Sequence, residues 1–305
     1  MRKGSGAAVA VAVAGLAAAG GAGAGTESPG GRIRARLLDD RFLVVPVKVN
    51  GSGPHPFLID TGATSTRIDE ALAARLGIAG STEVAWRTPT GVHRSRLARV
   101  SLTMGAVESP DTEALVAPLG SVRDLDPTIR GVVGQNVLRR GNWWLDYRGR
   151  SVTADLDGAL GDAGLGERLP LRWHADRPVV EARLPDGSAL RLVLDSGASS
   201  AVLFRNVAAR SVGWARLTTH GGEATVRTVT LGPLRLGSTR LPALVAGLFP
   251  DAEEKHRAED GLLPTGLFGG VYFDNREGTV VLNPRRDPPA RRLAPAALTG
   301  TGRGR

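Results

Sequence analysis

Two short motifs carry the residues best suited to chemistry in this chain. Positions 60–62 read Asp-Thr-Gly and positions 195–197 read Asp-Ser-Gly, and each aspartate follows three apolar residues. Two carboxyl groups that meet cannot both ionise easily, because like charges in contact push their proton affinities apart. They share one proton and titrate as a unit. One member can then take a proton from an attacking water while the other donates to a carbonyl oxygen. Asp60 and Asp195 are therefore the candidate catalytic pair.

The residues beside the two aspartates fit a supporting role. Gly62 and Gly197 lack a Cβ, which lets two strand ends approach closely and turn sharply. Thr61 and Ser196 carry short hydroxyls that could hydrogen-bond across an interface and hold the carboxyl groups coplanar. One such motif is a weak signal, because Asp and Gly are common in turns. Two motifs inside matching repeats are a strong one.

The elements that position the motifs occur twice. In the first copy, an apolar strand pattern at 42–49 is followed by an Asn-Gly turn and a strand that runs into Asp60. In the second copy, a strand pattern at 178–184 is followed by an Asp-Gly turn and a strand that runs into Asp195. Asn-Gly and Asp-Gly between apolar runs predict tight hairpins, since both dipeptides tolerate positive φ.

The agreement continues beyond the motifs. Ala-Ala-Arg occurs at 73–75 and again at 208–210, each expected in a short helix. Gly-Val-Val at 131–133 matches Gly-Leu-Leu at 261–263. Each copy ends in a strand-turn-strand pattern, from Trp143 to Val152 and from Val271 to Val280. Only two long copies are present, whereas a solenoid needs more and shorter repeats. The pattern therefore predicts two related lobes with pseudo-twofold symmetry.

The fold class that this pattern predicts is all-β, with a few short helices. The high glycine and proline content agrees with many turns between short strands. The expected organisation is a signal peptide at 1–24, an N-terminal lobe at 33–156, a linker at 157–167, a C-terminal lobe at 168–284 and a disordered basic tail at 285–305.

The sequence resembles the aspartic peptidases, above all the bacterial two-lobed retropepsin-like proteins. The Asp-Thr-Gly-Ala of positions 60–63 is the motif that retroviral-type peptidases carry, and Asp-Ser-Gly-Ala at 195–198 is a common variant of it. The later apolar-apolar-Gly element is present at 132–134, whereas positions 262–264 depart from it and read Leu-Leu-Pro. The resemblance covers nearly the whole chain after the first segment. It implies a bilobal pepsin/retropepsin-like acid protease fold that needs no cofactor.

The resemblance also implies a β-hairpin flap over the substrate. Residues 86–92 lie in the right interval after the first motif, with Pro-Thr-Gly as the turn. Trp86, Thr90 and Gly91 are the candidate substrate contacts. For Trp86, ordinary packing is an equal alternative.

The two ends of the chain indicate export. Arg2 and Lys3 precede an Ala/Val/Gly-rich run with small residues at 22–24, which predicts a signal peptide, with a retained membrane anchor as the alternative. We therefore expect a periplasmic or extracellular protein, with no stable membrane insertion after the signal is removed. The net charge of +9 is concentrated at the ends: Arg2 and Lys3 supply two charges and 285–305 supplies five. The nearly balanced body argues against nucleic-acid binding.

Other chemistries find no support in the sequence. The chain has no cysteine, which excludes disulfides, thiolate nucleophiles and sulfur-ligated metals. The five histidines are scattered without a zinc-binding spacing, and no Gly-x-Ser-x-Gly elbow occurs. We therefore expect no metal and no cofactor.

The function that the sequence predicts is hydrolysis of peptide bonds by an aspartic endopeptidase, acting as a monomer on a peptide or protein. Two alternatives remain open at this point. One is a peptide-binding module of the same fold without turnover. The other is an envelope-attached structural protein whose basic tail makes the contact.

Overall fold

The computed structural model describes residues 31–88, 91–162, 164–205, 207, 210–219, 222–249 and 258–284. The predicted signal peptide at 1–24 and the predicted basic tail at 285–305 lie outside these residues. The boundaries of the two lobes and the linker stay predictions. Among the described residues, no helix combines the length and apolar character that a membrane span needs.

The first half of the chain forms an eight-stranded sheet. In spatial order its strands are β2 (Arg36–Leu38), β3 (Phe42–Val49), β4 (Ser52–Ile59), β9 (Gly131–Val133), β5 (Thr66–Asp69), β8 (Val107–Ala117), β7 (Gly91–Met104) and β6 (Thr82–Thr88). β3 also pairs with β7, which curls the sheet back on itself. β9 lies between β4 and β5, parallel to the first and antiparallel to the second.

The second half repeats this plan in a ten-stranded sheet. Its strands are β17 (Arg210–Thr219), β18 (Gly222–Leu231), β21 (Leu244–Leu248), β16 (Ala201–Leu203), β22 (Gly261–Pro264), β15 (Ala189–Asp195), β14 (Arg177–Arg183), β19 (Leu234–Leu236) and β20 (Thr239–Leu241), with β13 (Arg172–His174) on β14. β22 lies between β15 and β16, parallel to the first and antiparallel to the second. Its place is that of β9 in the first half.

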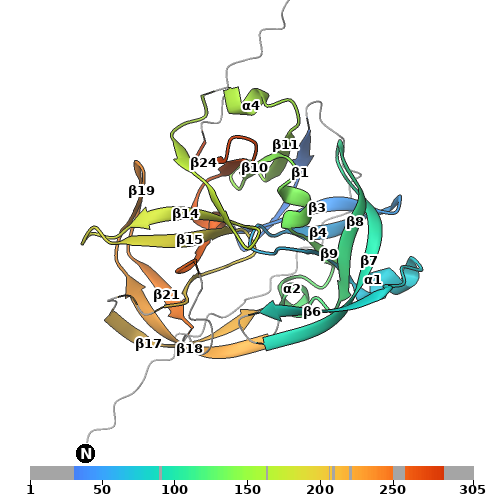
Figure 1. The fold of residues 1–305 in the computed structure, drawn as a ribbon, viewed down its shortest axis with the longest axis horizontal. Helices are drawn as coiled ribbons and strands as arrows, with labels where there is room; N and C mark the ends of the chain where they lie inside the picture. Colours follow the sequence, from blue (N-terminus) through green and yellow to red (C-terminus); the bar gives the residue numbers. More distant parts are fainter. Residues whose placement is uncertain are drawn as a thin grey trace, which may run out of the picture.

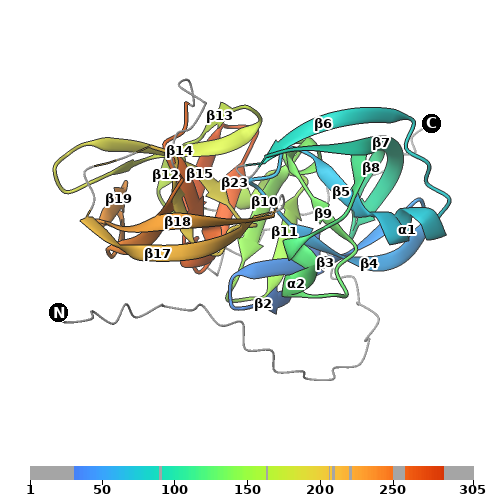
Figure 2. The same cartoon turned by 90° about the horizontal axis from the view of Figure 1, so that it is seen from below.

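A third sheet joins the two halves. Its six strands are β1 (Arg32–Arg34), β11 (Ser151–Asp155), β10 (Asn142–Asp146), β23 (Val271–Asp274), β24 (Thr279–Leu282) and β12 (Arg168–Pro170). The central pair, β10 and β23, comes from different halves and is antiparallel. Figure 1 shows this sheet at one end of the molecule, with the β6 and β17–β18 hairpins at the other. Figure 2 shows the two lobes side by side. The all-β, bilobal fold class is confirmed.

The predicted hairpin turns form where the sequence allows positive φ. Asn50 and Gly51 have φ values of 49° and 78° between β3 and β4, and Gly187 has a φ of 83° between β14 and β15. Both turns feed a strand that ends at a catalytic-pair candidate. The local turn residues therefore set the register of the strands that carry Asp60 and Asp195.

Helices are few and short. They are α1 (Glu70–Arg75), α2 (Ser121–Leu125), α3 (Gln135–Leu138), α4 (Ala159–Asp162) and the 3-10 turn η1 (Thr265–Leu267). The Asp69 carboxylate caps α1 by accepting from the Leu72 N–H at 3.3 Å. The helix expected at 208–210 is wrong at Arg210, which begins β17; Ala208 and Ala209 lie outside the described residues. The second copy has Phe204 at the position equivalent to Asp69, so it lacks the capping carboxylate.

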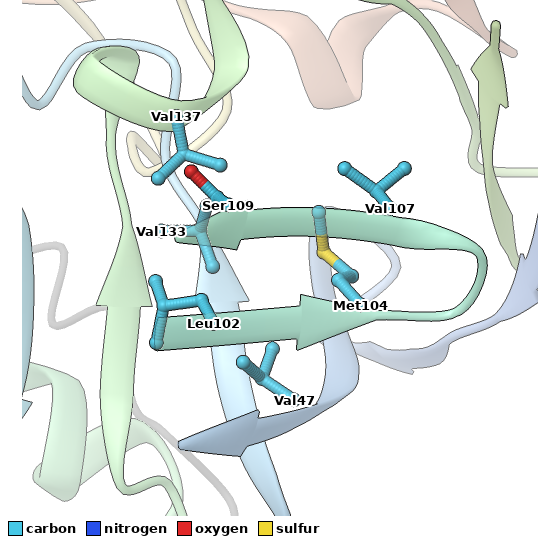
Figure 3. Close-up of a pocket in the computed structure, with 7 residues that line it drawn as sticks. All are labelled: Val47, Leu102, Met104, Val107, Ser109, Val133 and Val137. Carbon is cyan, nitrogen blue, oxygen red and sulfur yellow. The ribbon is translucent and has the colours of Figure 1, made fainter. Parts of the chain in front are cut away.

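The core is continuous from one lobe to the other, because apolar side chains of the six-stranded sheet belong to the same buried cluster as those of both lobe sheets. In the first lobe this core contains a cavity of about 10 Å³, too small for a peptide side chain. Figure 3 shows the side chains around it: Val47, Leu102, Met104, Val107, Ser109, Val133 and Val137. This cavity is a small gap in core packing.

The shared sheet predicts a strong dependence of stability on its central side chains. Leu145 of β10 pairs with Val271 of β23 and is 1% exposed. We expect Leu145→Ala to lower the free energy of unfolding by about 2–5 kcal/mol, because it leaves a cavity between the lobes. Leu156→Ala, at a leucine that is 53% exposed, is the matched control and should change it by less than about 0.5 kcal/mol. Urea denaturation followed by circular dichroism measures both; equal effects would contradict the prediction.

Candidate active site

The two candidate aspartates lie at equivalent strand ends. Asp60 directly follows β4, and Asp195 is the last residue of β15. The Asp60 N–H donates to the Val133 carbonyl of β9 at 3.1 Å, and Asp195 pairs with Pro264 at the end of β22. Both are buried, with 3% and 8% of their surface exposed. The parallel partner strands therefore fix the backbone position of both aspartates.

The structure brings the two carboxyl groups into contact. A Cβ placed on Gly62 would overlap the carboxyl group of Asp195, and a Cβ placed on Gly197 would overlap that of Asp60. A hydrogen bond joins the Asp195 carboxyl group to that of Asp60. Each glycine is thus required by the aspartate of the opposite lobe, because a larger residue would push the pair apart.

Thr61 and Ser196 cross-link the lobes directly beneath the pair. The Thr61 N–H donates to Ser196 Oγ at 3.0 Å, and the Ser196 N–H donates to Thr61 Oγ1 at 2.9 Å. Each hydroxyl in turn donates to a carbonyl of the other lobe: Thr61 to Leu194 at 2.7 Å and Ser196 to Ile59 at 2.8 Å. The four bonds are reciprocal and buried, so they fix the distance between the two strand ends.

Backbone N–H groups hold the carboxyl groups in place. Asp60 Oδ1 accepts from the N–H groups of Gly62 and Ala63, at 3.0 and 2.9 Å. Asp195 Oδ1 accepts from the Gly197 N–H at 2.8 Å. Hydrogen bonds of this kind stabilise the ionised form of a carboxyl group.

The pair is built to hold a proton. Burial, and then the charge of Asp60, raise the pKa of Asp195 to about 8, against the opposing effects of the Gly197 N–H and the Arg177 guanidinium. Two carboxyl groups in contact away from water ionise in two separated steps. Near neutral pH the pair therefore keeps one proton, with Asp195 as the group that carries it.

Several residues around the pair were missed by the sequence reasoning. Gln135 Nε2 donates to the Thr61 carbonyl at 2.7 Å from α3. The Tyr147 hydroxyl lies 2.5 Å from Thr265 Oγ1, and burial raises its pKa. Gln135 and Thr265 each come directly after an apolar-apolar-Gly/Pro element, so position was the one available signal. Nothing in the sequence indicated Tyr147.

The departure at Pro264 is compensated. In the first lobe, the Gly134 N–H donates to Thr66 Oγ1 at 3.1 Å, and Thr66 Oγ1 donates to Asn136 Oδ1 at 2.8 Å. The equivalent residues of the second lobe are Pro264, Ala201 and Gly266. The Gly134 N–H, the Thr66 hydroxyl and the Asn136 side chain are thus replaced together, and β22 keeps its pairing with β15.

The predicted flap is a hairpin of β6 and β7, in which Trp86 pairs with His93. Their ring centroids lie 4.8 Å apart, and Trp86 Nε1 donates to Ser95 Oγ at 2.9 Å. The guanidinium carbon of Arg67, on β5, lies 5.3 Å from the Trp86 ring centroid. Gly91 begins β7, and Thr90 lies outside the described residues. A substrate contact by the hairpin stays a prediction.

Among the residues that the structure describes, titratable side chains elsewhere do not form a metal site. In the described ranges, no three His, Asp or Glu side chains are grouped closely enough to hold an ion. The arrangement beneath the hairpin instead offers two carboxyl groups, one proton and a rigid backbone frame. Chemically, that set can exchange protons with a water and a carbonyl oxygen at once.

The crossed hydroxyls predict a structural role for Thr61. Thr61→Val keeps the shape of the side chain but removes the acceptor of the Ser196 N–H and the donor to Leu194. We expect a loss of about 1–3 kcal/mol in the free energy of unfolding, because a buried N–H is left without a partner. Thr64→Val, at an exposed threonine three residues away, is the control and should leave it nearly unchanged. Thermal denaturation compares the two; similar effects would show that the crossed bonds are not needed for stability.

The raised pKa of Asp195 predicts a pH dependence of stability. In the unfolded chain this carboxyl group ionises near the ordinary aspartate pKa of about 4, whereas in the folded protein it does so near 8. Its contribution to stability is therefore full below about pH 4 and is lost as pH rises toward 8. Asp195→Asn removes this ionisation, so we expect its melting temperature to exceed that of the unaltered protein increasingly from pH 5 to pH 8. A constant difference over that range would contradict the assignment.

Comparison with known proteins agrees with this geometry. A family model described as aspartyl protease matches the chain twice, over residues 45–137 and 180–270. The two matches together cover more than half of the chain, and each contains one Asp-Thr/Ser-Gly motif. No curated protein matches the chain. The chain belongs to the aspartyl protease family.

Proposed function

We propose that the protein is an active aspartic endopeptidase in which Asp60 and Asp195 hydrolyse peptide bonds. The observation that carries this proposal is the buried contact between the two carboxyl groups, which share a hydrogen bond. A peptide-binding module has no need of such a contact, because it costs stability wherever one carboxyl group must ionise. Thr61, Gly62, Ser196 and Gly197 hold the pair in place.

The reaction needs no group beyond the pair and a water. The water oxygen bonds to the carbonyl carbon, one water proton passes to the ionised carboxylate, and the protonated carboxyl group gives its proton to the carbonyl oxygen. The neutral tetrahedral intermediate then collapses: the C–N bond breaks, the nitrogen takes the proton from the first carboxyl group, and the hydroxyl returns its proton to the second. Both carboxyl groups end as they began.

The substrate would be an extended peptide between the lobes. Strand edges recognise extended peptides through main-chain hydrogen bonds, with pockets for alternate side chains. The β6–β7 hairpin lies on the side of the molecule opposite the six-stranded sheet (Figure 1), and Trp86 and Gly91 of this hairpin would contact the peptide. Thr90, the third candidate contact, lies outside the described residues.

The finer placement of the protein is also a proposal. The Asp-Thr-Gly-Ala and Asp-Ser-Gly-Ala motifs in one chain support a bacterial two-lobed retropepsin-like peptidase. Since a single chain supplies both carboxyl groups, it would act as a monomer. The basic, Ala-rich N-terminal segment supports export to the periplasm or the exterior, where a peptide or protein would be the substrate.

The decisive test is cleavage of a diverse peptide library. We expect hydrolysis that pepstatin inhibits, and a loss of at least about a thousandfold in kcat/KM for Asp60→Asn and for Asp195→Asn, because neither proton transfer can proceed without its carboxyl group. Asp124→Asn, at an exposed aspartate, is the matched control and should retain full activity.

The outcomes separate the alternatives. Binding of library peptides without cleavage, unchanged in Asp60→Asn, would identify a peptide-binding module instead. If Asp60→Asn kept its activity while removal of residues 285–305 abolished function in the cell, the structural-protein alternative would hold.

A further inference from the structure

An arginine lies near each member of the aspartate pair, and the two arginines are not equivalent: Arg67 is buried, whereas the Arg177 side chain is 22% exposed. Arg177 of β14 acts electrostatically on Asp195, and Arg67 of β5 interacts with Asp60. Arg177 has a carboxylate of its own, since its Nη2 contacts Glu259, whose side chain is almost fully buried. Glu259 Oε2 also lies 2.6 Å from His174 Nδ1. The positive charge of Arg177, near Asp195, is therefore largely offset by the Glu259 carboxylate.

Arg67 is placed differently. It is 3% exposed, and its Nη1 is buried without a hydrogen-bond partner in the part of the chain that the structure describes. One face of its guanidinium lies over the Trp86 ring, at 5.3 Å from the centroid. Burial lowers the pKa of Arg67, and the charge of Asp60 raises it. A guanidinium stays charged in proteins, so this buried charge requires a nearby anion.

The strand register places Arg67 and Asp60 on one face of the sheet. Arg67 pairs with Val132, and Val132 pairs with Leu58, so these three side chains share a face. Asp60 comes two residues after Leu58 and continues on that face. In the second lobe the residue that pairs with Leu262 in the same way is Val202. The first lobe therefore has a cation, Arg67, at this strand position, whereas the second lobe has the uncharged Val202.

We propose that Arg67 is a positioning residue that holds the negative charge of the aspartate pair on Asp60, and that its contact with Trp86 ties the β6–β7 hairpin to this arrangement. The inference rests on the proposed function and assigns the roles of base and acid to the two aspartates. Asp60 receives the proton of the attacking water, and Asp195 protonates the carbonyl oxygen.

Three observations indicate that the negative charge of the pair lies on Asp60 rather than on Asp195. The buried Arg67 charge acts on Asp60 in a low-dielectric region, where charge interactions are strong. Asp60 Oδ1 accepts two backbone N–H bonds, from Gly62 and Ala63. On the other side, Glu259 offsets Arg177.

Tyr147 also lies near the pair and interacts electrostatically with Asp195. Burial raises the pKa of Tyr147, so it stays neutral over the range in which the pair titrates. Arg67 thus acts on Asp60, whereas Arg177 acts on Asp195, and neutral Tyr147 adds no charge to the pair.

Arg67→Met and Arg67→Lys test the proposal. Loss of the cation destabilises the ionised form of Asp60. Arg67→Met should therefore raise, by about 1 unit or more, the pKa that describes the loss of kcat/KM at low pH, which is the acid limb of the profile. Arg67→Lys keeps the charge and should stay near the unaltered profile. Arg99→Met, at an exposed arginine that pairs with Asp111 and Glu113, is the control and should not move the limb.

Stability separates positioning from structure. Arg67→Met removes one partner of a buried charge pair, so it should lower the melting temperature near neutral pH, where Asp60 is ionised, and do so less at low pH, where Asp60 is protonated. A melting temperature lowered equally at both pH values, with an unmoved acid limb, would overturn the proposal, because Arg67 would then serve the fold alone.

A second measurement does not depend on cleavage. Carboxyl carbons of ¹³C-labelled aspartates are titrated by NMR, with Asp60→Asn and Asp195→Asn to assign the pair. The first ionisation of the pair should shift upward in Arg67→Met and not in Arg99→Met. An identical titration with and without Arg67 overturns the inference even if peptides are cleaved. If the first ionisation shifts as expected but the protein cleaves no peptide, the charge assignment holds and the proposed function is wrong.

Discussion

The structure depends on one constraint: two carboxyl groups, remote in sequence, are held in contact away from water and must share a proton. Every neighbouring feature serves that contact. Gly62 and Gly197 leave room for the opposite aspartate, and the hydroxyls of Thr61 and Ser196 link the two strand ends. Burial then raises the proton affinity of Asp195. A site of this kind is rigid because its frame is made of backbone and short side chains, which have little freedom to relax.

The pseudo-twofold symmetry is close in the backbone and broken in the side chains. β9 and β22 occupy equivalent places, yet Thr66, Gly134 and Asn136 have no hydrogen-bonding counterparts at Ala201 and Pro264. The symmetric frame brings identical groups together, whereas the different surroundings allow them to act differently. Hydrolysis needs one base and one acid at the same moment; the shared proton supplies both, and the different surroundings favour one aspartate as its carrier.

Much of this could be predicted from local sequence. The Asn50-Gly51 turn, the apolar strands before each aspartate and the two motifs all follow from short-range rules of turn chemistry and strand pattern. The partners of Gln135 and Arg67 could not, because they depend on how distant segments of the first lobe are brought together rather than on neighbouring residues. The helix expected at 208–210 failed at Arg210 for a similar reason: sheet pairing with β18 outweighs a weak helical preference.

The six-stranded sheet has a consequence for how the two halves associate. Each half supplies three of its strands, and the seam between them is the antiparallel pairing of β10 with β23. A half on its own would present an open strand edge flanked by Trp143 and Leu145, and open apolar edges pair with whatever strand is available. The most suitable partner for one half is a second copy of itself. In this chain the other half is that partner, and because the two halves have separate sequences, their side chains can differ.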